Sequence, residues 1–175
     1  MIISVEEAKT LIDFKDWTDE KIARKLNAIE KTIRAYTNNN FQSRAYRKTA
    51  DIVGGLFVMD AQLFKPGDTV QVSESALNAG LFTVAVVSDL DLSVEEEVVD
   101  EAEVLVTKVV YPDDVIDCAV NLLEWEVKNR EKVGIQSETL SRHSVTYFAQ
   151  DASNQVMGYP AALLGCLKAY RKARC

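Results

Sequence analysis

The hydrophobic residues of this chain follow a helical period at both ends and a period of two in the middle, and this change constrains the fold most. Near the N-terminus, Ile22, Leu26, Ile29 and Ile33 recur at three- and four-residue steps, which predicts an amphipathic helix. Between residues 41 and 110, apolar residues alternate with polar ones over short runs, as in antiparallel strands. The pattern predicts an α+β protein whose helical core is interrupted by a small antiparallel β-barrel-like insertion.

Local signals set the expected limits of the first helices. Ser4 opens a short helical segment with Glu7 three residues later, which is the pattern of a capping box, and Thr18 is placed to cap a second helix. Three asparagines at positions 38–40 should end that second helix, because asparagine favours caps and left-handed turns over helix interiors.

Turn residues divide the middle segment into four or five expected strands. Gly54 and Gly55 form the turn of a predicted hairpin spanning residues 52–58, and further strands are expected at 69–72, 81–87 and 103–110. Strands of this number and length suit a small barrel of the SH3-like or OB-like kind.

The helical pattern returns after residue 111. Asp113 and Asp114 favour a helix N-terminus, and the apolar face continues towards Gly134. Pro160 suits the first position of a last helix that reaches Lys172, and the residues between these helices indicate a loop with β character. We therefore group residues 1–40 and 111–175 as one helical core and residues 41–110 as an inserted β module.

The net charge of −7 belongs entirely to this β module. Residues 41–110 hold five basic and twelve acidic side chains, whereas both helical parts are neutral. A chain of this kind lacks the basic surface that sequence-independent binding to DNA or RNA requires. The charge distribution therefore argues against adhesion to nucleic acid.

The sequence also argues against a membrane protein and a disulfide framework. No apolar run approaches the roughly 18 residues of a spanning helix, and the first residues lack the pattern of a secretion signal, so we expect neither membrane insertion nor Sec export. Cys118, Cys166 and Cys175 are widely spaced and odd in number, which favours reduced thiols. We expect Cys118 and Cys166 to be small buried hydrophobic residues.

No motif predicts catalysis or cofactor binding. His143 is the only histidine and has no hydrolase or zinc motif around it, which favours a polar loop residue. The acids between residues 89 and 100 have the spacing of a calcium loop, but Val94 and Asp100 stand where an EF-hand needs glycine and glutamate. Neither Gly54-Gly55 nor Gly67 begins a phosphate-binding loop. The sequence predicts no catalytic residue, no cofactor and no metal.

The last eight residues contain four bases and no acid: Lys168, Arg171, Lys172 and Arg174. Basic residues at the end of a helix complement its dipole, which explains the pattern by stability alone. A basic terminal segment can also engage a partner. Both interpretations stay open at this point.

Several stretches of the helical parts resemble the head–tail connector proteins of tailed bacteriophages. Residues 133–147, VGIQSETLSRHSVTY, are similar to the Gly-Ile-x-Ser-Glu-x-Ile-Gly-x-x-Ser-x-x-Tyr stretch of those connectors, with Ser141 in place of the second glycine. Residues 163–172, LLGCLKAYRK, are similar to their Leu-Lys-x-Tyr-Arg ending, and residues 5–9 and 19–37 resemble their opening. Residues 64–84 resemble a small β module of phage structural proteins, which simple connectors lack.

The resemblance implies an adaptor in the virion neck of a siphophage or prophage, made in the bacterial cytoplasm. About twelve copies would form a ring beneath the portal protein, extend the channel for double-stranded DNA and join the head to the stopper or tail-completion protein. By resemblance, the loop of residues 135–147 makes the contacts between subunits and residues 167–175 face the portal. The candidate ring residues are Ile135, Ser137, Glu138, Leu140, Val145 and Tyr147; the candidate portal residues are Leu167, Lys168, Tyr170, Arg171, Lys172 and Arg174.

Three other functions stay open as alternatives. The chain could be another neck component, such as a stopper. It could be a nucleic-acid-binding β module on a helical carrier, although five bases against twelve acids argue against this. An enzyme would need a cleft that joins His143 to Cys166, or a pair of carboxylates.

Overall fold

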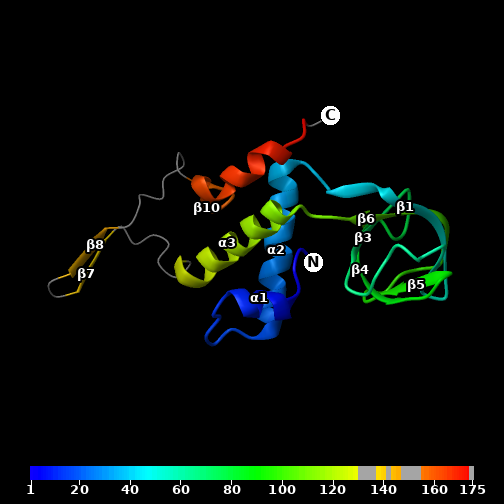
Figure 1. Ribbon diagram of the computed structural model, residues 1–175, viewed down its shortest axis with the longest axis horizontal. Coiled ribbons are helices and arrows are strands. Elements are labelled where there is room, and N and C mark those ends of the chain that lie inside the picture. Colours follow the sequence, from blue (N-terminus) through cyan, green and yellow to red (C-terminus); the bar gives the residue numbers. More distant parts are fainter. Residues whose placement is uncertain (130–136, 141–142, 147–154, 174–175) are drawn as a thin grey trace. The chain divides into compact units, whose positions relative to one another are not determined.

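The computed structural model describes residues 1–129, 137–140, 143–146 and 155–173, and the chain divides into two compact units (Figure 1). The barrel unit contains Met1–Ser4 and Asn40–Tyr111, and the helical unit contains Val5–Asn39 and Pro112–Cys175. The protein is of the α+β class, with its described helices in one unit and its main sheet in the other. Met1–Ser4, which we expected among the helices, join the barrel unit, and Ile2 and Ile3 are buried.

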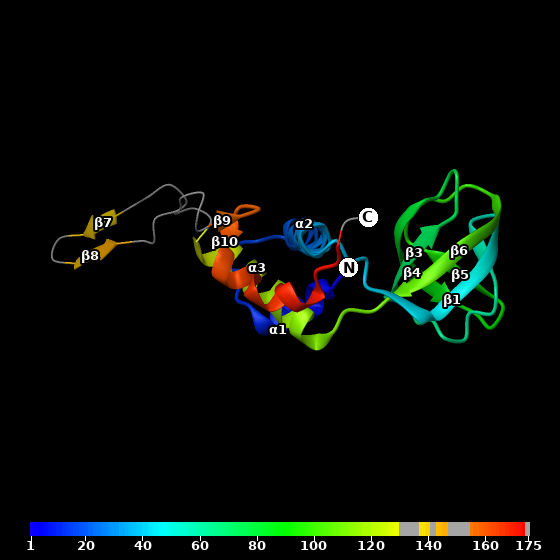
Figure 2. The ribbon, with the colours of Figure 1, turned by 90° about the horizontal axis from the view of Figure 1, so that it is seen from above.

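Six antiparallel strands close into a barrel in the order β1-β2-β5-β4-β3-β6. Figure 2 shows this barrel from a second direction. The strands are β1 (Gln42–Val53), β2 (Leu56–Val58), β3 (Thr69–Ser73), β4 (Gly80–Val87), β5 (Asp91–Val94) and β6 (Glu101–Val109). We expected four or five strands. The additional strand is β5, whose single fully buried apolar residue, Leu92, stands among acids that hide a strand pattern.

The Gly54-Gly55 hairpin is confirmed. Ile52 pairs with Phe57 and Val53 with Leu56, and the two glycines between these pairs have φ values of +60° and +82°. Positive φ at both turn positions matches the twist of the flanking strands and favours glycine. Inward residues of all six strands, with three from the loop after β2, form the barrel core: Ala50, Ile52, Phe57, Met59, Ala61, Phe64, Val70, Val72, Val84, Leu92, Val104 and Val106.

The helical unit contains α1 (Val5–Leu11), α2 (Asp19–Thr37), α3 (Asp113–Asn129) and the 3₁₀ helix η2 (Ala161–Tyr170). The predicted start and end of α2 are confirmed. Thr18 Oγ1 accepts a hydrogen bond from the Lys21 amide at 3.4 Å, and Asn38 ends the helix in the left-handed conformation. The predicted stripe of Ile22, Leu26, Ile29 and Ile33 is fully buried. This face packs α2 against α3 and η2.

The last helix differs from the prediction in type and length. Residues 161–170 form a 3₁₀ helix, whereas we expected an α-helix to residue 172. Leu164 and Leu167 are fully buried and Tyr170 is half-buried, so the inward residues recur every three positions. That spacing fits the three residues per turn of a 3₁₀ helix, whose side chains at i and i+3 are aligned.

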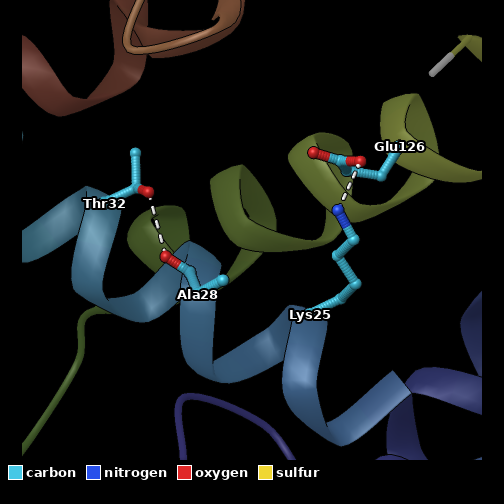
Figure 3. A network of polar contacts seen from close by, with 4 residues as sticks. All are labelled: Lys25, Ala28, Thr32 and Glu126. Atoms are coloured by element: carbon cyan, nitrogen blue, oxygen red, sulfur yellow. Dashed lines mark hydrogen bonds and ion pairs between the residues drawn. The ribbon is translucent and has the colours of Figure 1, made fainter. Parts of the chain in front are cut away.

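A charged pair joins α2 to α3 (Figure 3). Lys25 Nζ lies 3.0 Å from Glu126 Oε2, and the Glu126 side chain is only 1% exposed whereas that of Lys25 is 32% exposed. About two turns further along α2, the Thr32 hydroxyl donates to the carbonyl of Ala28 at 2.9 Å. No local pattern predicts the Lys25–Glu126 pair, because its members are 101 positions apart in the sequence.

Two short antiparallel sheets lie between α3 and η2 in the sequence. The first pairs β7 (Ser137–Leu140) with β8 (His143–Thr146), and the second pairs β9 (Gln155–Val156) with β10 (Tyr159–Pro160). β10 leads directly into η2, and the Tyr159 ring packs edge-on against Trp125 of α3 with centroids 5.5 Å apart. The second sheet therefore anchors the start of η2 on α3.

The expectation of reduced thiols is wrong for two of the three cysteines. Cys118 of α3 and Cys166 of η2 form a disulfide with their Cα atoms 6.6 Å apart, within the usual range for such a bond. The packing of η2 on α3 brings the two positions together across 48 residues, which spacing alone could not reveal. Cys118 is buried as expected, whereas Cys166 is exposed.

No helix within the described ranges is both long enough and apolar enough to cross a membrane.

Candidate functional site

The C-terminal segment is bound to the end of α2. The Lys172 amide donates to the carbonyl of Thr37 at 2.8 Å. Asn38 and Asn39 donate from their side-chain amides to the carbonyls of Ala173 at 2.9 Å and Tyr170 at 3.3 Å. The asparagines that end α2 therefore also hold the chain that follows η2.

This arrangement places bases of the C-terminal segment beside the negative end of the α2 dipole. Arg171 lies over the ring of Tyr36, with its guanidinium carbon 5.2 Å from the ring centroid. Lys172 is exposed, and its amide is bonded to the last residue of α2. The cluster thus complements the dipole of α2 across the fold, as well as that of its own helix. Lys168 of η2 adds a third exposed base.

Tyr170 connects the same segment to the start of α3. Its hydroxyl lies 2.7 Å from both carboxylate oxygens of Asp114. The hydrogen bond to this carboxylate is the main cause that raises the pKa of the Tyr170 phenol. The phenol therefore stays a proton donor and fixes the end of η2 on the first turn of α3.

The six candidate portal residues have different environments. Lys168, Arg171 and Lys172 are exposed, Tyr170 is half-buried, and Leu167 is fully buried and packs η2 into the helical unit. Arg174 lies outside the described residues. Of the five candidates that the structure describes, the three bases are the exposed ones and are available to a partner.

The candidate ring residues fall on the first small sheet and its flanks. Ser137 pairs with Thr146 and Glu138 with Val145, while Leu140 pairs with His143, so these positions form a hairpin. Ile135 and Tyr147 lie outside the described residues. His143 is the first residue of β8, so the one histidine lies on a strand, where we expected a loop.

The acids with calcium-loop spacing do not form one loop. Asp91 and Ser93 belong to β5, and the Asp100 carboxylate accepts a hydrogen bond from the Gly54 amide at 2.8 Å. Across the described parts of the chain, no three histidine, cysteine, aspartate or glutamate side chains are arranged to hold a metal ion. These residues therefore do not surround one point: Asp91 and Ser93 lie along the extended backbone of β5, and Asp100 is bound to the turn between β1 and β2.

One carboxylate of the barrel has a structural role that the sequence did not indicate. Glu101 accepts hydrogen bonds from the Ser75 hydroxyl at 2.5 Å, the Ala76 amide at 2.6 Å and the Asn78 side-chain amide at 2.8 Å. These donors, the Ser75 hydroxyl first, lower the Glu101 pKa to about 2. The ionised carboxylate fixes the loop between β3 and β4 on the start of β6.

An open hollow of about 500 Å³ lies beside α1, and its lining includes Lys9, Phe14 and Trp17. Trp17 is covered by the Lys21 ammonium at 4.0 Å from the ring centroid. None of the residues predicted to contact a partner lines this hollow. Neither His143 nor Cys166, the two residues that an enzyme was expected to bring together, lines this hollow, and its lining contains a single carboxylate, that of Asp13.

In comparison with known proteins, the chain matches no protein-family model and no curated protein sequence.

Proposed function

We propose that this chain is a structural virion protein, a head–tail connector of a tailed bacteriophage. About twelve copies form a ring beneath the portal protein, extend the DNA channel and join the filled head to the stopper or tail. The helical unit is the connector core of this proposal, and the barrel is an insertion in it. The proposal rests on the sequence resemblance together with the following features of the helical unit.

The observation that carries the proposal is the small sheet β7–β8. Its strands occupy residues 137–140 and 143–146, within the segment that resembles the ring loop of connectors. Its two strands pair with each other as a separate two-stranded sheet, and such a sheet is marginally stable alone in water. Each of its outer edges can pair with the backbone of another chain. A neighbouring copy of this chain supplies that support in a ring.

The exposed bases at the end of the helical unit support a portal contact. Lys168, Arg171 and Lys172 are gathered by the anchoring of residues 170–173 on α2, which gives a fixed patch of positive charge. Fixed charges steer a complementary partner and set its orientation. A barrel that lines the channel would ease the passage of DNA, because its net charge of −7 repels phosphates, whereas a barrel on the outside of the ring would not.

Two matched variants separate ring formation from portal binding. Replacing residues 137–146 by a glycine-serine segment of equal length should abolish self-assembly, measured as molar mass by light scattering. Lys168→Glu should leave self-assembly intact and weaken binding to the cognate portal protein. Lys31→Glu makes the same change of charge at an exposed base of α2 and should affect neither self-assembly nor portal binding. Unchanged assembly after loss of the hairpin, or equal effects of the two lysine variants, would contradict the proposal.

The same measurements test the alternatives. A stopper would bind the assembled connector and would fail to bind the portal alone. A nucleic-acid-binding β module would retard DNA at low salt, which the twelve acids of residues 41–110 argue against.

A further inference from the structure

The outer face of the barrel carries a row of aliphatic side chains across four strands. Val53 pairs with Leu56, Leu56 with Ser93, and Ser93 with Val86. Paired residues of neighbouring antiparallel strands project from the same face, so these four side chains are neighbours. Val53, Leu56 and Val86 are 58%, 41% and 64% exposed. Three large aliphatic side chains thus share one outward row.

A second row lies two residues away and contains two acids. Val58 pairs with Asp51 on one side and with Asp91 on the other. Residues two apart on a strand share a face, so this row adjoins the first, and Val58 is 49% exposed. The intervening residues Ile52, Phe57 and Leu92 are core residues that are at most 1% exposed, which confirms that both rows point outward. We call these seven residues the outer patch: Asp51, Val53, Leu56, Val58, Val86, Asp91 and Ser93.

The composition of the outer patch defines the chemistry of its complement. Four adjacent exposed aliphatic side chains favour an apolar partner surface. Two carboxylates flank Val58 and the patch contains no base, so the partner must carry positive charge. Nucleic acid and anionic membranes carry the wrong sign. If a second copy docked patch to patch, Asp51 and Asp91 of one copy would face the same two acids of the other, and the like charges would repel.

The closed barrel limits how a partner can bind. Every residue of the barrel strands is described, and closure leaves no free strand edge for an added strand. The partner therefore binds through side chains, as an amphipathic helix does on an apolar surface. Asp51 and Asp91 lie two strand spacings apart, which is about 10 Å. Residues seven apart on a helix are separated by about 10.5 Å and share a face.

We propose that the outer patch binds an amphipathic helix of a partner protein, with bases at positions i and i+7 and aliphatic residues at i+3 and i+4. The two bases pair with Asp51 and Asp91. The aliphatic residues cover Val58 and Leu56. This inference depends on the barrel alone, so it holds whether or not the chain forms a portal-bound ring.

Fluorescence anisotropy with labelled synthetic helices and the full chain tests the proposal. The probe carries two lysines at i and i+7 and leucines at i+3 and i+4, on an alanine–glutamine background. A control helix of equal composition carries its lysines at i and i+5, which places the charges on different faces. We expect the probe to bind at least about tenfold more tightly than the control. Equal binding of the two helices would show that charge alone attracts them and would overturn the proposal.

Variants locate the binding site. Leu56→Ser with Val86→Ser, and separately Asp51→Asn with Asp91→Asn, should each weaken probe binding at least about tenfold. The asparagine at position 51 keeps an oxygen for the Glu103 amide, which the Asp51 carboxylate accepts at 2.9 Å. Leu11→Ser with Leu77→Ser removes two leucines that are 57% and 64% exposed outside the patch, and should leave binding unchanged.

Two further outcomes would overturn the proposal. One is an equal loss of affinity in the Leu11→Ser, Leu77→Ser control. The other is self-association of the wild-type chain that Leu56→Ser with Val86→Ser abolishes in light scattering, because the patch would then be a contact between copies. Far-UV circular dichroism of each variant confirms that the barrel is folded before affinities are compared.

Discussion

Replacing Lys25 by methionine should destabilise the helical unit by roughly 2–3 kcal/mol, which is more than the removal of any exposed charge of that unit should cost. The Lys25 ammonium lies 3.0 Å from Glu126 Oε2, a distance at which unit charges attract by about 5–6 kcal/mol at an effective dielectric constant of 20. Desolvation of the carboxylate offsets part of this attraction. Removing one partner of a fully buried pair typically costs about 3–5 kcal/mol, and the 32% exposure of Lys25 lowers the expected value.

Urea unfolding followed by tryptophan fluorescence measures this effect on the helical unit alone. Trp17 and Trp125 are the only tryptophans, and both lie in that unit. Methionine keeps the apolar stem of the lysine, so the change isolates the charge. The midpoint should fall without a change in the slope of unfolding against urea.

A matched pair on the same helices supplies the control. Lys128 pairs with Glu124 one turn earlier on α3, and these side chains are 64% and 44% exposed. Lys128→Met should therefore cost about 0.5 kcal/mol or less. Equal effects of Lys25→Met and Lys128→Met would refute the reasoning, because burial of Glu126 would then add nothing to the pair.

Three further predictions concern the barrel and the disulfide. The Glu101 carboxylate has a pKa of about 2 in the folded protein against an ordinary value of 4.5. Its contribution to the stability of the barrel is therefore complete above pH 4.5 and is lost as the pH falls towards 2. Glu101→Gln should flatten this pH dependence when unfolding of the barrel is followed by NMR. Gly55→Val should destabilise the barrel by about 1 kcal/mol or more in thermal unfolding, because φ there is +82°, whereas Gly165→Ala, in open space, should not. Reducing the Cys118–Cys166 bond should lower the free energy of unfolding of the helical unit by about 4 kcal/mol, from the 48-residue loop it closes, and an unchanged urea midpoint in dithiothreitol would contradict this.

Elements with strong local signals could be predicted from the sequence. The α2 stripe, its Thr18 cap and its asparagine end follow from local chemistry, as does the Gly54-Gly55 hairpin. β5 could not be predicted in the same way, because a four-residue strand buries only Leu92 fully and carries acids nearby. Local pattern identifies an element when several residues share one periodicity, and it fails when a single buried residue defines the strand.

Contacts between residues that are far apart in the sequence could not be predicted from it. The Lys25–Glu126 pair and the Cys118–Cys166 bond depend on how α2, α3 and η2 pack, and neither leaves a local signal. The anchoring of the C-terminal segment had a partial signal in the asparagines at 38–40, because side-chain amides at the end of a helix can donate outward as well as cap. Their second role became evident only from the position of residues 170–173.

The count of copies bound to a portal ring tests the proposed function most directly. Native mass spectrometry of the cognate portal protein, mixed with an excess of this chain, should show one complex with about twelve bound copies and few intermediate stoichiometries, because each bound copy offers its β7–β8 sheet to the next. A portal ring that remains bare, or one that binds single copies without progression to a complete ring, would contradict the connector proposal.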